Sequence, residues 1–319
     1  MPIRVRTTPK LSSPKPRSLR RAGFALAAVT AITISGCSHK SSSNPAQEPL
    51  RVGVIPFDKA SVIIDEYTPL ATYLSKKTGR PSGKVFVTPE YAGVLQALRA
   101  DQVDCAYLSP LAYVLAANEF KNLPEHLVPI AMPYFHGKLT YQGIIFVRTD
   151  SGIHKITDFK GKSFVFADRT SASGYLYPAG LMKEAGVDPQ RDVKAANITG
   201  AGSVLAVYNK VADGGASYED AIEQQLKDPA EVKQMSVIAK TDPIPNGMFV
   251  ARGNLDPKTI AALQKAFVDI NTDPEGQAAA QKILYPKWVP ADDPFFDSVR
   301  KKATILGLSL ESLKGVKKK

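Results

Sequence analysis

The stretch FADRTSASGYL, residues 166–176, stands at a junction between two kinds of local pattern. The run Ser163 to Ala167 is strand-like, whereas residues 173–185 carry apolar side chains at helical spacing. The small hydroxyl residues between these two patterns are typical of a helix N-terminus. A strand that leads into a helix in this way is the repeating unit of an α/β fold.

The same junction is a candidate site for binding an anion. The first turn of a helix has backbone N–H groups without intrahelical partners and carries the positive end of the helix dipole. Thr170, Ser171 and Ser173 add hydroxyl donors. Gly174 lets a ligand approach the backbone closely, and Tyr175 supplies a flat wall. The alternative interpretation is a helix with a serine-rich cap and no ligand.

Upstream of the junction, three strand-like runs alternate with three stretches of helical periodicity. A series of this kind predicts a parallel sheet with helices on both faces. Two more strands are expected at 127–132 and 141–147. The earlier strands are expected at 50–55, 84–87 and 103–107. Two helices are expected at 91–99 and 110–119, and a first helix is expected to end at Lys76, Lys77 and Gly79, a pattern typical of a helix C-terminus.

Downstream of the junction a second α/β series begins, and a final segment follows it. Two such series with a return segment predict two α/β lobes around a ligand cleft, joined by two crossover segments near Arg148–Gly152 and Lys240–Ile244. Lobe 1 is therefore expected to comprise residues 50–148 and 245–319, and lobe 2 residues 149–244. The expected elements are strands at 163–167, 192–197, 235–239 and 247–250 and helices at 173–185, 203–211, 218–227, 257–270, 274–283 and 297–306.

The formal charge of +11 is concentrated at the two ends of the chain. Residues 1–36 hold seven lysines and arginines and no acid, and Lys314 and Lys317 to Lys319 account for the remaining excess. The body between is nearly balanced and has no basic stripe interleaved with aromatic residues, so a nucleic-acid partner is not expected.

The N-terminal segment has the order of a secretory signal. A basic stretch ends at Arg20-Arg21, an apolar run covers residues 22–34, and Ile34-Ser35-Gly36-Cys37 follows. The apolar run is short for a bilayer span. The segment resembles bacterial lipoprotein precursors, which implies a signal peptide over 1–36, lipidation of Cys37 and a flexible tether over 37–49. An uncleaved anchor is the alternative.

Residues suited to catalysis or metal binding are scattered. The two cysteines, Cys37 and Cys105, allow no disulfide framework and no cysteine metal site. None of the histidines forms a ligand pair at i, i+4 spacing, and there is no nucleophile elbow, phosphate-binding loop or cofactor fingerprint. We therefore expect no enzyme, no metal and no cofactor.

Several segments, in order and with natural spacing, look like one family. They are YTPLATYLSKKTG (67–79), PEYAGVLQALRADQVDCAYLSPLAYVLA (89–116), YQGIIFVRTDSGI (141–153), TDFKGKSFVFAD (157–168), SASGYLYPAGLMKEAGVDPQRD (171–192) and PADD (290–293). They resemble the substrate-binding lipoproteins of ABC importers for phosphonate, phosphite and phosphate. The resemblance covers most of residues 50–308. It implies a type II periplasmic-binding-protein fold whose two lobes close on an oxyanion.

The resemblance also implies a set of ligand-binding residues. The anion seat of the family is a Ser-Thr-Ser-Gly run that opens a helix, and it matches residues 171–174, where the middle hydroxyl is missing. Two tyrosines on the facing wall match Tyr91 and Tyr141; read alone, each is a half-buried core aromatic. The implied set is Tyr91, Tyr141, Thr170, Ser171, Ala172, Ser173 and Gly174.

The chain departs from the family at two polar positions. Relatives that bind aminophosphonates carry a histidine where this chain has Gly200, and an acid after Pro-Ile-Pro, where it has Asn246-Gly247. A buried ammonium group without a partner is costly, so an aminophosphonate is expected to bind poorly. The glycines are also expected to enlarge the pocket for a bulkier anion. Arg169 either supplies a compensating charge or points to solvent.

We therefore expect an exported, lipid-anchored, monomeric solute-binding protein of an ABC importer. It would capture a small oxyanion of the phosphate, phosphite or alkylphosphonate type and deliver it to a permease and its ATPase. One alternative is a sensing module of the same fold that signals to a receptor or kinase. Another is a binder of a bulkier organic anion.

Overall fold

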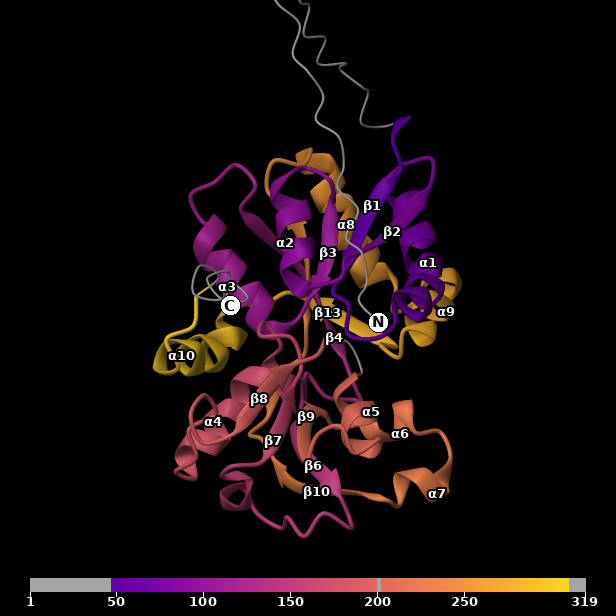
Figure 1. Cartoon of the computed structure of the whole chain (residues 1–319). Helices are drawn as coiled ribbons and strands as arrows, with labels where there is room; N and C mark the ends of the chain where they lie inside the picture. The colour runs from indigo at the N-terminus through magenta and orange to yellow at the C-terminus, as the bar shows by residue number, and fades with distance from the viewer. Residues whose placement is uncertain (1–46, 200–201, 310–319) are drawn as a thin grey trace, which may run out of the picture. The chain divides into compact units, whose positions relative to one another are not determined.

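Two β-sheets carry the fold, and the chain builds most of the first, then the second, and then returns to the first (Figure 1). The computed structural model describes residues 47–199 and 202–309, which lie within one compact unit. Within these residues the first sheet has the strand order β13-β4-β12-β3-β1-β2, and the second has the order β10-β6-β9-β7-β8. We call each sheet with its helices lobe 1 and lobe 2, respectively.

The first sheet begins as the predicted parallel series. Strand β1 pairs in parallel with both β2 and β3, and the three expected helices connect or follow these strands. The returning strand β12 lies antiparallel between β3 and β4. The elements of lobe 1 are β1 (Leu50–Val54), α1 (Ala60–Lys77), β2 (Gly83–Val87), α2 (Tyr91–Arg99), β3 (Cys105–Leu108), α3 (Pro110–Phe120), β4 (Leu127–Tyr134), β12 (Met248–Arg252), α8 (Pro257–Asp269), α9 (Pro274–Lys282), β13 (Lys287–Pro290) and α10 (Asp297–Ile305).

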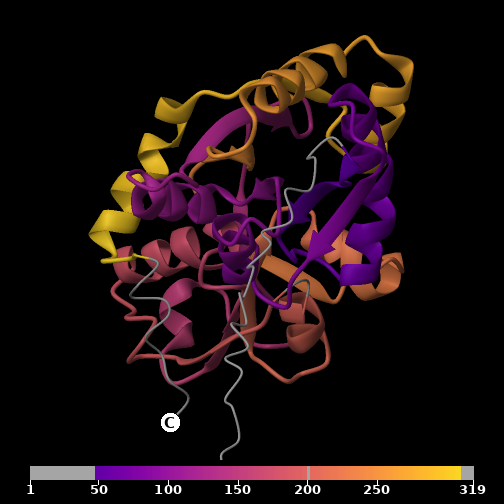
Figure 2. The same cartoon turned by 90° about the horizontal axis from the view of Figure 1, so that it is seen from above.

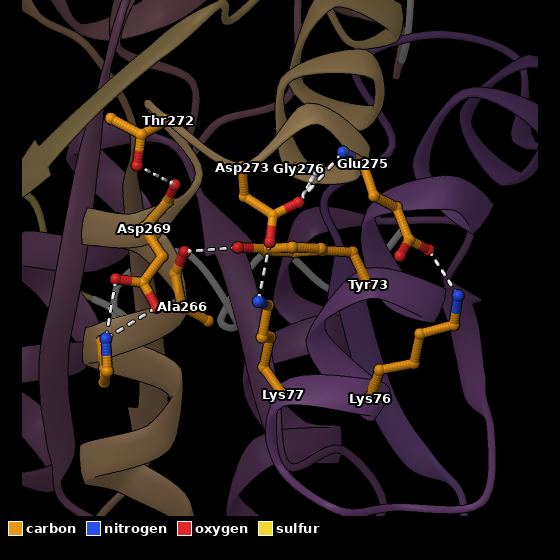
Figure 3. Close-up of polar contacts among 10 residues, drawn as sticks. Tyr73, Lys76, Lys77, Ala266, Asp269, Thr272, Asp273, Glu275 and Gly276 are labelled. Atoms are coloured by element: carbon orange, nitrogen blue, oxygen red, sulfur yellow. Dashed lines mark hydrogen bonds and ion pairs between the residues drawn. The ribbon is translucent and has the colours of Figure 1, made fainter.

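The C-terminal helices α8 and α9 join lobe 1 by packing beside α1 (Figures 1 and 3). Figure 3 shows the polar contacts of this junction: the Tyr73 hydroxyl donates to the Ala266 carbonyl at 3.1 Å, and Lys77 Nζ lies 2.7 Å from an Asp273 carboxylate oxygen. Asp273 also caps α9 by accepting hydrogen bonds from two backbone N–H groups. Segments almost two hundred residues apart in the chain are thereby joined into one lobe.

A buried charge cluster ties three strands of the first sheet together. The Asp104 side chain is 1% exposed and accepts from Arg51 on β1 at 2.7 Å and from Arg252 on β12 at 3.0 Å. Burial alone would raise the pKa of Asp104, but the hydrogen bonds from Arg51, and then from Arg252, outweigh burial and lower it. The carboxylate therefore stays ionised inside the lobe.

Lobe 2 is built on a sheet with one strand that the sequence pattern did not predict. Strand β9 is central in this sheet, whereas the prediction began a helix at Tyr218. Its Gly214 packs so closely that a Cβ would lie 2.4 Å from the Phe159 ring, which explains a strand without the usual large residues. The elements are β6 (Gly143–Arg148), β7 (Ser163–Phe166), the π-helical turn η3 (Ala172–Leu176), α4 (Tyr177–Glu184), β8 (Lys194–Asn197), α5 (Gly202–Tyr208), β9 (Gly214–Tyr218), α6 (Ala221–Gln225), α7 (Pro229–Val232) and β10 (Met235–Lys240).

The first passage between the sheets lies earlier than predicted. Strand β6 pairs with β9 and β10, so residues 143–148 belong to the sheet of lobe 2 and the predicted crossing at Arg148–Gly152 is wrong. The short strands β5 (Thr140–Tyr141) and β11 (Ile244–Pro245) pair antiparallel with each other and carry both passages side by side. Figure 2 shows the same elements from above, with the yellow α10 beside α3.

Several predictions concern residues outside the described ranges. These are the signal peptide over 1–36, the lipidation site Cys37, most of the tether over 37–49, Gly200 and the C-terminal lysines. In the ranges that are described, none of the helices is long and apolar enough to cross a membrane.

Candidate ligand-binding site

A cavity of about 140 Å³ lies where the C-terminal ends of strands from both sheets meet. Phe57 follows β1, Tyr107 lies near the end of β3, and Tyr218 ends β9. The carboxyl ends of strands in α/β sheets are the usual place for a ligand, because the loops that follow can project side chains without breaking the sheet. The cavity therefore has the position expected for the cleft between two lobes.

Lobe 2 contributes a wall of small hydroxyl residues from the FADRTSASGYL stretch. Ser171 caps η3, and its Oγ accepts a hydrogen bond from the Gly174 N–H at 3.1 Å. Ser171, Ser173 and Gly174 all line the cavity. A Cβ on Gly174 would lie 2.3 Å from the Cβ of Ala167, so only glycine allows this turn to lie against the end of β7.

Thr170 and Ala172 do not line the cavity, although the resemblance placed them in the binding set. The Thr170 hydroxyl donates to Asp168 Oδ1 at 2.7 Å, so it stabilises the loop. Ala172 is fully buried and packs in the hydrophobic core of lobe 1, because η3 lies against α3. The absence of a hydroxyl at position 172 therefore has a packing explanation here.

Tyr91 and Tyr141 line the cavity from other parts of the chain. Tyr91 is the first residue of α2, and Tyr141 lies in β5 between the two sheets. Burial raises the pKa of both hydroxyl groups; at Tyr141, hydrogen bonding with Ser173 offsets only part of this rise. Both tyrosines are therefore neutral at physiological pH, and their hydroxyl groups can donate hydrogen bonds.

The loop before η3 also contacts lobe 1 directly. Asp168 Oδ2 accepts from the Tyr91 backbone N–H at 3.3 Å, at the start of α2. The Ser109 hydroxyl, which caps α3, donates to the Thr170 carbonyl at 2.8 Å. Two helix starts of lobe 1 therefore hold the loop that carries the serines of lobe 2.

An aromatic wall from lobe 1 completes the cavity, and the sequence analysis did not find it. Tyr107 and Tyr285 have ring centroids 5.5 Å apart, and the Tyr107 hydroxyl donates to that of Tyr285 at 3.0 Å. Behind them lies the buried Trp288. Single tyrosines at distant places in a sequence are most simply interpreted as core residues, and only their contact in the folded structure shows that they form one wall. The cavity is also lined by Phe57 and Phe135.

Gly247 does not enlarge the cavity as expected. A Cβ at this position would lie 2.4 Å from Tyr107 Cζ and 2.6 Å from the Leu108 carbonyl oxygen. The Tyr107 ring therefore occupies the space that a side chain at 247 would need. Its neighbour Asn246 is buried and donates to the carbonyls of Pro133 and Lys138, so it stabilises the passage between the sheets.

The charged side chains that line the cavity are carboxylates. Asp58 and Glu66 are half-buried at its edge, and among the described lining residues there is no lysine or arginine. Burial raises the pKa of Glu66, and the charge of Asp58 raises it further. The cavity therefore has two carboxylates at its edge, at positions other than those considered from sequence, and the weak binding of an aminophosphonate stays a prediction.

Arg169 supplies no charge to the cavity. Its guanidinium lies over the Tyr175 ring, 5.3 Å from the centroid, and the residue is half-buried outside the cavity lining. Neither alternative considered from sequence applies, because the side chain stacks on its own lobe. In the described ranges, no cluster of three or more histidine, cysteine or acidic residues is arranged to hold a metal ion.

Comparison with known proteins gives consistent matches along the chain. A family model described as the periplasmic substrate-binding protein of an ABC phosphonate transporter matches residues 52–294. The phosphate-import protein of Mycolicibacterium smegmatis is 33% identical over 308 residues, covering 88% of this chain and 94% of that protein. The phosphonates-binding periplasmic protein of Escherichia coli is 26% identical over 274 residues, covering 83% and 78%.

Solved structures show the same architecture. A binding protein component of an ABC phosphonate transporter from Pseudomonas aeruginosa superposes with a TM-score of 0.74 at 26% identity, covering 81% of this chain and 86% of that one. A Prochlorococcus marinus protein in complex with methylphosphonate superposes with a TM-score of 0.70 at 18% identity, covering 83% and 99%. At 18% identity, the similarity to the Prochlorococcus marinus protein shows a shared fold only.

Proposed function

Because the chain belongs to the family of periplasmic substrate-binding proteins of ABC phosphonate transporters, we propose that it captures a phosphate- or phosphonate-type oxyanion between its lobes. This membership confirms the family and the two-lobed fold predicted from the sequence. Proteins of this family bind a small ligand for an ABC importer and act in transport. The proposed partners are accordingly a permease and its ATPase.

The observation that carries the proposal is the meeting of two sets of hydroxyl groups in one cavity. Ser171 and Ser173 come from lobe 2, whereas Tyr91 lies at the start of a helix in lobe 1 and Tyr141 lies between the sheets. Neutral donors that are already oriented bind an oxyanion strongly, because each hydrogen bond is charge-assisted. An oxyanion can therefore be bound in this way without a cationic side chain.

The contacts between the lobes support a mechanism of closure. The hydrogen bonds from the Tyr91 N–H to Asp168 and from the Ser109 hydroxyl to the Thr170 carbonyl exist only while the two lobes lie together. A ligand that bridges Ser173 and Tyr91 favours this arrangement because it binds the closed form better. Small-angle scattering with and without phosphate and methylphosphonate tests closure, and identical profiles at saturation would count against it.

A titration panel tests the function itself. Calorimetry with phosphate, phosphite, methylphosphonate and sulfate should give saturable 1:1 binding for at least one phosphorus oxyanion. A ligand present at 100 times its dissociation constant should also stabilise the protein by about 2.7 kcal/mol in a thermal-shift assay. If none of the phosphorus compounds binds, the proposal fails.

The proposed location follows from the N-terminal segment together with the family. Export, lipidation of Cys37 and tethering of a monomer at the extracytoplasmic membrane face are all part of this proposal. The Cys37→Ser protein should move from the membrane fraction to the soluble exported fraction. An unchanged membrane fraction, or an acyl group absent from the mature N-terminal peptide by mass spectrometry, would contradict it.

A further inference from the structure

Leu284 has a backbone conformation that is unfavourable for leucine. It follows α9 with a φ of +60°, in the left-handed region. The Leu284 N–H donates to the Gln281 carbonyl, and the Tyr285 N–H donates to the Ala280 carbonyl, each at 3.0 Å. This pair of bonds is the Schellman motif, in which the left-handed position usually holds glycine because a Cβ crowds the backbone there.

Three other helices of the same protein end with glycine at this position, whereas the polar residues Asp101 and Lys210 occupy it after α2 and α5. Gly79, Gly186 and Gly307 occupy the left-handed position after α1, α4 and α10, with the same pattern of two hydrogen bonds. Leu284 is also 56% exposed, so its apolar surface gains little from burial within the protein. A residue that is unfavourable in both backbone conformation and exposure points to a role outside folding.

The Leu284 side chain lines the ligand cavity. It stands beside Ile283 and Tyr285, and the Tyr285 ring packs against Tyr107. Tyr107 in turn fills the space next to Gly247. The left-handed turn therefore places a leucine from lobe 1 in the lining of the cavity, next to an aromatic surface.

We propose that Leu284 is a specificity-determining residue that packs on the apolar part of an organic substituent of the bound oxyanion, a substituent larger than methyl. This inference rests on the proposed function and names its class of ligand. One water needs about 10–15 Å³ of such space, so a cavity of about 140 Å³ has room for more than the four heavy atoms of a PO₃ group. Asp58 and Glu66 at the cavity edge disfavour a substituent that ends in a carboxylate.

The Leu284→Gly variant distinguishes the contact of the Leu284 side chain with the ligand from the effect of its backbone conformation on stability. Glycine relieves the left-handed conformation, so the melting temperature of the ligand-free protein should stay equal or rise. Phenylphosphonate, the probe for a large uncharged substituent, should bind at least about fivefold more weakly to the variant, and its loss should clearly exceed that of methylphosphonate. The measurements are calorimetric titrations and a thermal melt.

Lys210→Gly is the matched control. Lys210 ends α5 with a φ of +61° in the same two-bond motif, is exposed and does not line the cavity. Its ion pair with Asp150 is exposed and contributes little. This variant should show the same direction of thermal shift, with wild-type affinity for both phosphonates.

The possible outcomes distinguish the proposed role of Leu284 from the proposed function of binding a phosphorus oxyanion. Wild-type protein that binds methylphosphonate but not phenylphosphonate would overturn the role of Leu284 and leave the proposed function intact. Equal weakening of both ligands in Leu284→Gly, or no weakening, would also overturn it. Binding of neither phosphonate nor phosphate would overturn the function and the inference together.

Discussion

Replacing Ser171 by alanine removes two interactions, one within the protein and one with the proposed ligand. The Ser171 Oγ caps η3 by accepting from the Gly174 N–H at 3.1 Å, and Ser171 also lines the cavity. Loss of such a cap costs about 1 kcal/mol, which lowers the melting temperature by roughly 2 °C in a chain of this size. Loss of a charge-assisted hydrogen bond to the oxyanion costs about 1.5–3 kcal/mol, or roughly ten- to a hundredfold in affinity.

Ser173→Ala separates the two effects. Ser173 lines the cavity but does not cap the helix, so this variant should lose a comparable factor in affinity with a smaller change in melting temperature. Asp228→Ala is the control for capping alone, because Asp228 caps α7 by accepting from the Ala230 N–H at 2.8 Å and does not line the cavity. It should lower stability and leave affinity unchanged.

The assay is a calorimetric titration with the oxyanion that the wild-type protein binds best, joined to a thermal melt of each ligand-free variant. The expected pattern is weakened binding in both serine variants and a clear loss of stability only in Ser171→Ala and Asp228→Ala. Wild-type affinity in Ser171→Ala and Ser173→Ala would refute the assignment of the serine wall as the oxyanion site.

Three further variants test the cavity, the contact between lobes and the buried charge. Gly247→Ala should destabilise the protein by about 1–3 kcal/mol and weaken ligand binding, because the new Cβ would collide with Tyr107 at 2.4 Å; a normal melting curve with normal titration would contradict this packing. Asp168→Asn should weaken the contact with the Tyr91 N–H and make the ligand-free protein more extended by small-angle scattering, with about fivefold weaker binding; an unchanged scattering profile would argue against an interlobe role. Asp104→Asn should cost about 3 kcal/mol at neutral pH because it removes the buried anion that two half-buried arginines share. Since the folded pKa of Asp104 is lowered, its contribution is present above about pH 4 and is lost as the pH falls. Urea unfolding from pH 6 to pH 3 should therefore show the gap from wild type closing, and a constant gap would disprove this linkage.

The parts of the fold that follow from local pattern were predictable. The buried face of α1, formed by Tyr67, Leu70, Ala71 and Leu74, repeats at helical spacing, and each of these residues is buried as expected. The parallel order of β1, β2 and β3 follows from their alternation with helices. Strand β9 was missed because Gly214 packs closely against Phe159 and Gly215 against Phe146, and both partners lie more than fifty residues away.

The candidate site was predictable only where a motif is continuous. Ser171, Ser173 and Gly174 fall together in one turn, and both tyrosines implied by the resemblance reach the same cavity. Thr170 and Ala172 belong to the same run, but the loop and the core of lobe 1 use them instead. Neighbours in the sequence can therefore face different surroundings once a turn is formed.

The alternation of strands and helices, the serine turn and the family could be predicted from the amino-acid sequence, because each depends on residues close together in the chain. Only the folded structure shows that Tyr107 fills the space beside Gly247, that Tyr285 and Leu284 line the same cavity as the serines, and that the cavity carries carboxylates but, among its described lining residues, no lysine or arginine. These features arise where segments far apart in the chain pack at the ends of two sheets. Local propensity cannot specify such contacts, because the partners meet only after both lobes have formed.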